Sequence, residues 1–76
     1  MIATPNSKQL IADFLRQIRR TKKLTQNEVA KLLQVDRSTI TRIEQGKMTI
    51  DLDKFMILCQ GLNIESEKII ELFKKN

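Results

Sequence analysis

Histidine, tryptophan and tyrosine are absent from this sequence of 76 residues, and cysteine and proline occur once each. Without histidine, the chain cannot assemble a Ser/His/Asp or Cys/His catalytic arrangement, or a familiar zinc ligand set. Its two glycines, Gly46 and Gly61, stand apart, which excludes a glycine-rich phosphate loop. We therefore expect no enzymatic activity, no bound metal and no cofactor.

The single cysteine and the lack of long hydrophobic runs bear on where the protein works. Cys59 offers no intramolecular disulfide, which fits a reducing compartment. Residues 1–7 lack a basic start followed by an apolar run, and no stretch approaches the roughly 20 apolar residues of a membrane span. We expect a soluble, cytoplasmic protein that does not bind membranes.

The chain has the length of one domain and the periodicity of helices. No strand-type alternation occurs in it. Apolar residues at three- and four-residue spacings predict a first helix from about Ser7 to Lys22. These residues are Leu10, Ile11, Phe14, Leu15 and Ile18. The sequence thus predicts an all-α domain over residues 7–76, preceded by a short N-terminal arm at residues 1–6.

Two short helices joined by a tight turn are predicted between residues 24 and 46. Thr25 and Glu28 have the spacing of a capping box, so a helix should begin at Thr25. The buried face of this helix consists of Val29, Leu32 and Leu33. Asp36 can cap a second helix of about Arg37 to Gln45, and Gly46 can end it with a positive φ.

Five hydrogen-bonding side chains share one face of that second helix. At about 100° per residue they fall within an arc of roughly 140°, away from Ile40 and Ile43. They are Arg37, Ser38, Thr41, Arg42 and Gln45. Composition alone favours an ordinary solvated face, because exposed helix residues are usually polar. The residues around this helix are therefore needed to distinguish a solvated face from a binding surface.

Two more helices are predicted in the remaining sequence. They run from about Asp51 to Leu62, with Asn63 as a positive-φ ending, and from about Ser66 to Lys74. The core-facing stripe expected in the earlier of the two consists of Leu52, Phe55, Met56, Cys59 and Leu62. Cys59 is therefore interpreted as a core thiol rather than a reactive one.

Positive charge is concentrated in the first part of the chain. Residues 1–47 contain ten Lys or Arg and four acids, a net charge of +6, whereas residues 48–76 contain four and five, a net charge of −1. A basic half of this kind matches the electrostatic footprint of a protein that contacts a phosphate backbone. The flexible ammonium groups of Lys22, Lys23 and Lys47 lie near predicted helix ends, where they can reach phosphates.

The ordered set Arg19, Leu24-Thr25-Gln26, Val29-Ala30, Val35, Ser38, Ile40, Ile43-Glu44 and Gly46 resembles the helix-turn-helix family of Cro and the phage repressors, the Xre family. The resemblance covers about residues 10–72. It implies a compact, lambda-repressor-like bundle of about five helices, with the helix-turn-helix at about residues 25–46. It also implies that the second helix of the motif lies in the major groove of double-stranded DNA.

The resemblance also assigns roles to individual residues. The base-contacting positions are Arg37, Ser38, Thr41 and Arg42, the phosphate-contacting ones are Gln26 and Gln45, and Arg19 with Glu44 matches a structural ion pair. Arginine can bond guanine O6 and N7 together, so the two arginines are the expected readers of G·C pairs. The hydroxyls of Ser38 and Thr41 predict no base, because a hydroxyl both donates and accepts.

Simpler interpretations of these residues remain open. Gln26 can be a solvent-exposed residue of a first helical turn, and Arg19 with Glu44 can be a surface pair worth no more than about 1 kcal/mol. Lys23 and Gln34 stand where the family often has glycine, so either side chain would have to tolerate positive φ, at about 1 kcal/mol each.

The last two helices carry more apolar residues than one core-facing stripe needs. The surplus is Ile57, Ile69, Ile70 and Phe73. A two-fold dimer that buried them could place two recognition helices about one DNA turn, roughly 34 Å, apart on a palindromic operator. Alternatively, these residues only complete a small core.

Three functions are compatible with this pattern. The first is a sequence-specific transcriptional regulator, a dimeric repressor or controller that blocks or recruits polymerase. The second is an antitoxin-type autoregulator, which would have a toxin as its partner. The third is a protein-interaction adaptor that uses the same fold without specific DNA readout.

Overall fold

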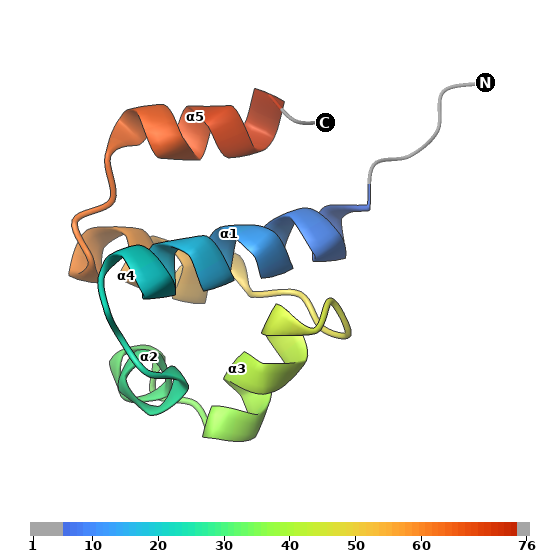
Figure 1. The fold of residues 1–76 in the computed structure, drawn as a ribbon, viewed down its shortest axis with the longest axis vertical. Coiled ribbons are helices and arrows are strands. Elements are labelled where there is room, and N and C mark those ends of the chain that lie inside the picture. The colour runs from blue at the N-terminus through green and yellow to red at the C-terminus, as the bar shows by residue number, and fades with distance from the viewer. Residues whose placement is uncertain (1–5, 75–76) are drawn as a thin grey trace.

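A computed structural model describes residues 6–74, and within them the chain forms five helices and no strand, as the sequence predicted. The helices are α1 (Ser7–Thr21), α2 (Gln26–Leu33), α3 (Arg37–Glu44), α4 (Leu52–Gly61) and α5 (Ser66–Lys74). In Figure 1, α1 crosses the middle of the molecule, with α2 and α3 below it and α5 above. Of the predicted arm, only Asn6 lies inside the described residues, and its side chain caps α1.

The start of α2 confirms the predicted capping box. The Glu28 backbone N–H donates to Thr25 Oγ1 at 3.1 Å, and the Thr25 backbone N–H donates to Glu28 Oε1 at 2.9 Å. The pKa of the Glu28 carboxyl is lowered, mainly by the hydrogen bond from the Thr25 backbone and further by a hydrogen bond with the Thr25 side chain. Two otherwise unpaired backbone donors are thereby satisfied, which fixes where α2 begins.

The start of α3 corrects one expectation. Asp36 is the N-cap residue, but its side chain makes no capping hydrogen bond. The backbone N–H of Thr39, which a capping side chain would use, donates instead to the Asp36 carbonyl at 2.9 Å. At the other end, α3 stops at Glu44, one residue before the predicted end, and Gly46 has the expected positive φ of 73°.

Three connections turn through a left-handed residue that is not glycine. Lys23 and Gln34 have φ of 58°, and Asn63 has φ of 51°. The positive φ considered for the first two positions, and expected for Asn63, is therefore present. Asparagine tolerates this region better than lysine or glutamine does, because its short polar side chain can bond locally.

Glycine at position 34 is expected to stabilise the protein. Gln34→Gly removes the contact between Cβ and the following carbonyl that disfavours positive φ, so the free energy of unfolding should rise by about 1 kcal/mol. Urea unfolding followed by circular dichroism measures the change. Lys31→Gly, at an exposed position inside α2, is the control and should cost about 1 kcal/mol. A destabilised Gln34→Gly variant would contradict the argument.

The core lies where α1, α2 and α3 meet. Its largest fully buried side chains are Leu15, Leu33, Ile40, Leu58 and Val29. α4 adds Leu58 to this core, and the buried residue of α5 is Leu72. α5 therefore rests on the bundle through one buried side chain, whereas α1 buries four residues.

The stripe predicted for α4 is wrong in part. Leu52 and Met56 are 73% and 50% exposed, and Leu58, which the prediction left out, is 1% exposed. Phe55 and Leu62, three and four residues from Leu58, pack against the core with it. α4 is apolar on most sides, so its sequence contains two overlapping stripes of apolar residues with helical spacing. The packing of α4 against α2 buries the stripe centred on Leu58.

Cys59 lies at the edge of the core rather than inside it. Its side chain is half-buried, and this burial raises the pKa of the thiol. A raised thiol pKa disfavours the thiolate, which is the nucleophilic form of cysteine. Within residues 6–74, no helix is both long enough and apolar enough to cross a membrane.

Candidate nucleic-acid interface

α3 has one side fixed in the protein and one side facing solvent. Ile40, Ile43 and Glu44 are at most 4% exposed. The opposite side carries four of the five predicted contact residues in exposed positions, and Thr41 is half-buried beside them. The exposed four are Arg37, Ser38, Arg42 and Gln45. The helix therefore presents two guanidinium groups on a rigid support.

An ion pair holds α3 to α1. Arg19 Nε donates to Glu44 Oε2 at 2.7 Å, and Arg19 Nη2 donates to Glu44 Oε1 at 3.0 Å. A third bond joins Arg19 Nη1 to the Leu24 carbonyl at 3.1 Å. The side chain of Glu44 is 5% exposed and that of Arg19 is 18% exposed. The hydrogen bond to Glu44 raises the pKa of the Arg19 guanidinium. Its burial and two-point geometry differ from those of a weak surface pair.

The side chain of Gln26 is engaged inside the protein. Its Nε2 donates to Glu44 Oε1 at 3.2 Å, and its Oε1 accepts from the Thr41 hydroxyl at 3.0 Å. Thr41 is also within bonding distance of the Arg37 carbonyl, at 3.2 Å. Sequence reasoning missed this bridge between α2 and α3. Local sequence patterns do not predict this bridge, because Gln26 lies 15 residues from Thr41 and 18 residues from Glu44.

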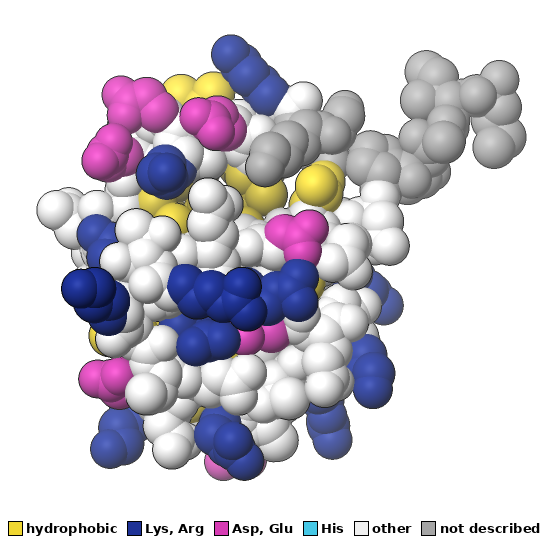
Figure 2. Space-filling model, viewed as in Figure 1, with side chains coloured by type: hydrophobic (Ala, Val, Ile, Leu, Met, Phe, Trp, Pro, Cys, Tyr) yellow, Lys and Arg dark blue, Asp and Glu magenta, His cyan; other side chains and the backbone are white. Residues whose placement is uncertain are grey.

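Positive side chains surround this part of the molecule. Lys22 and Lys23 are exposed in the turn before α2, and Lys47 is exposed just after α3. Figure 2 shows a band of Lys and Arg at the height of α1 and more of them around the end that holds α2 and α3. Acidic side chains gather at the opposite end, where α5 lies. On the face that Figure 2 shows, the uneven charge of the sequence therefore corresponds to an uneven distribution of charged side chains in space.

Comparison with known families agrees with this geometry. A family model described as helix-turn-helix matches residues 15–69, which include α2, α3 and the ion pair. The chain belongs to the helix-turn-helix family. The match is of the Xre/Cro type, an all-α, lambda-repressor-like fold. This family consists of DNA-binding regulators and is generally non-enzymatic, so the helix-turn-helix chain is a DNA-binding domain.

This helix-turn-helix protein is similar in sequence to a curated protein that is named as an antitoxin. It is the antitoxin PezA of Streptococcus pneumoniae, which is 28% identical over 61 residues. The similar region covers 80% of the present chain and 39% of the relative. The chain thus corresponds to about two fifths of that antitoxin.

Proposed function

We propose that this protein is a sequence-specific transcriptional regulator, a repressor or controller that binds its operator through α3. The observation that carries the proposal is the two-sided α3. Its inner side is held by Ile40, Ile43 and the Arg19–Glu44 pair, and its outer side offers Arg37 and Arg42 to solvent. A helix of this kind can enter the major groove without changing its contacts to the bundle.

The proposed contacts divide into readers of bases and binders of phosphates. The base-contacting residues are Arg37, Ser38, Thr41 and Arg42. The phosphate-contacting residues are Gln26, Gln45, Lys22, Lys23 and Lys47. The side-chain amide of Gln26 is hydrogen-bonded to Glu44 and Thr41. We therefore propose that Gln26 contacts the phosphate in part through its backbone N–H, in the first turn of α2.

Selection from random duplex DNA tests the proposal. At about 0.15 M salt, nonspecific attraction to phosphates is partly screened, so enrichment reports on base contacts. Enrichment of an inverted repeat would establish a dimeric regulator and give its operator. Folded protein that enriches no sequence would contradict sequence-specific binding and favour a protein-interaction adaptor.

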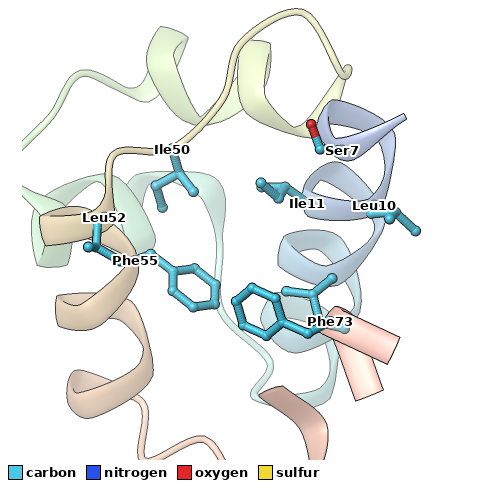
Figure 3. Close-up of a pocket in the computed structure, with 8 residues that line it drawn as sticks. Ser7, Leu10, Ile11, Ile50, Leu52, Phe55 and Phe73 are labelled. Atoms are coloured by element: carbon cyan, nitrogen blue, oxygen red, sulfur yellow. The ribbon is translucent and has the colours of Figure 1, made fainter. Parts of the chain in front are cut away.

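We further propose that the regulator is a homodimer through the surface of α4 and α5. Phe73, Ile70 and Ile57 are 65%, 51% and 38% exposed, and Ile69 is half-buried. A cavity of about 240 Å³, lined in part by Phe73, opens between the start of α1, the start of α4 with the segment before it, and the end of α5. In Figure 3, side chains from α1, α4 and α5 surround this hollow.

A second copy is the occupant that these features favour. A two-fold interface is self-complementary, and the exposed apolar side chains of α4 and α5, together with the apolar cavity that Phe73 helps to line, offer such a surface to a second copy. Residues 48–76, which contain α4 and α5, have a net charge of only −1, so two copies can approach there without strong repulsion. The strongly basic half of each copy stays free for DNA.

Phe73→Glu is expected to separate the dimer. A charge at this position would have to be buried in the interface, so the dissociation constant of the dimer should rise at least about tenfold. Size-exclusion chromatography with light scattering measures the change. Gln17→Glu, which adds the same charge at an exposed position of α1, is the control and should leave the mass unchanged. A monomeric wild type at high concentration would contradict the dimer.

An antitoxin-type autoregulator is the second candidate, and the similarity to PezA favours it. In this case the same α3 would bind the operator, and a toxin would be the protein partner. Affinity purification of the tagged protein from its native cells tests this candidate. Recovery of a toxin in fixed proportion would support it, and a chain recovered without one would favour the stand-alone regulator.

A further inference from the structure

Thr41 is the one predicted base reader that shares its side chain with another helix. Its hydroxyl lies 3.0 Å from Gln26 Oε1 and 3.2 Å from the Arg37 carbonyl oxygen. Both of these partners are acceptors, and a hydroxyl has a single proton to donate. The orientation of Gln26 therefore matters, because rotating its amide by half a turn would present an N–H to Thr41 instead.

The ion pair fixes the orientation of that amide. Arg19 can only donate and the ionised Glu44 can only accept. Gln26 must turn its NH₂ group to Glu44 Oε1, 3.2 Å away, so its carbonyl oxygen faces Thr41. The opposite orientation would set two acceptors against each other beside a carboxylate that is 5% exposed. The direction of each hydrogen bond from Arg19 to Thr41 is thereby determined.

We infer that Thr41 reads its base pair as a hydrogen-bond acceptor. Its proton is committed inside the protein, and its two lone pairs can accept from an exocyclic amine in the major groove, adenine N6 or cytosine N4. Guanine N7 and O6 and thymine O4 are acceptors themselves and are rejected by this hydroxyl. The inference rests on the proposed function and narrows it to the kind of base that Thr41 can contact. The hydroxyl of Ser38, by contrast, can serve either kind of base.

The test begins with the operator selected by the wild type. Selection repeated with Thr41→Val, which keeps the shape and removes the hydroxyl, identifies the base pair that Thr41 reads. That pair is then rebuilt with an analogue lacking the amine, deoxynebularine for adenine or the 2-pyrimidinone nucleoside for cytosine. The wild type should lose about threefold to tenfold in affinity, as for one hydrogen bond, and Thr41→Val should lose almost nothing.

Thr41→Ser is the matched variant, because it keeps the hydroxyl and removes the methyl group. It should remain as sensitive to the missing amine as the wild type. The same analogue at an operator position outside the α3 contact controls for weaker base pairing. If Thr41→Ser instead loses a preference that Thr41→Val keeps, and the pair contains a thymine whose replacement by uracil weakens binding, the methyl group is the reader and the inference is overturned.

Other outcomes also decide the matter. A selected guanine or thymine acceptor that Thr41→Val no longer prefers would mean that the hydroxyl donates, which contradicts the inference. A Thr41→Val selection identical to that of the wild type would mean that the hydroxyl of Thr41 reads no base, with the same consequence. If the wild type enriches no operator, the proposed function fails first and the inference falls with it.

Discussion

Arg19→Ala is expected to lower the free energy of unfolding by about 3 kcal/mol, the lower end of the cost of breaking a buried ion pair, because Glu44 is buried and Arg19 is partly buried. The substitution leaves Glu44, with a side chain 5% exposed, facing only the amide of Gln26. It also removes the bond to the Leu24 carbonyl. Urea unfolding at pH 7 should show a lower midpoint with an unchanged slope.

Arg20→Ala is the control for this prediction. Arg20 is the next residue of α1 and is exposed, so its loss should change stability by no more than about 0.5 kcal/mol. The double replacement of Arg19 and Glu44 by methionine should cost less than Arg19→Ala, because no buried charge is left unpaired. Equal effects of Arg19→Ala and Arg20→Ala would show that the pair contributes no more than an ordinary surface pair.

Arg42→Ala is expected to weaken binding to the selected operator by about 1 to 3 kcal/mol and to relax specificity at one base pair. The reason is the loss of a two-point contact to guanine O6 and N7, which alanine cannot replace. Fluorescence anisotropy with the operator, and with three duplexes that carry the other base pairs at that position, measures both effects. The variant should bind all four duplexes with similar affinity.

Lys22→Ala is the comparison that separates base reading from general attraction. As a proposed phosphate contact, it should weaken all four duplexes about equally and reduce the dependence on salt by about one released ion. The assignment of Arg42 would be wrong if Arg42→Ala behaved in this same way. Stability measurements on both variants check that the fold is retained, as expected for exposed side chains.

Local sequence patterns predicted most of the helix limits. Thr25 with Glu28, and Gly46, are signals that act within one helical turn, and the structure confirms them. Asp36 had the correct position for a cap, but a backbone carbonyl took the donor that its side chain would have used. Residue type therefore predicts where a helix begins more reliably than it predicts which atom accepts the hydrogen bond from the free backbone N–H at that point.

Contacts between helices were harder to predict. The choice between Leu58 and Met56 in α4 depends on how that helix is rotated against α2, and periodicity within an apolar segment does not determine it. The bridge from Gln26 to Thr41 depends on the distance between two helices as well. The family resemblance paired Arg19 with Glu44, but it did not predict which neighbours would complete the network.

The attachment of α5 through the single buried residue Leu72 has a consequence for how the protein responds to its own abundance. A helix of nine residues is too short to be stable alone in water, so it depends on what it packs against. If a second copy covers its outer side, folding of α5 and association become one equilibrium governed by mass action. Amide hydrogen exchange in α5 would then slow as protein concentration rises, and operator occupancy would rise more steeply than in proportion to the number of chains in the cell.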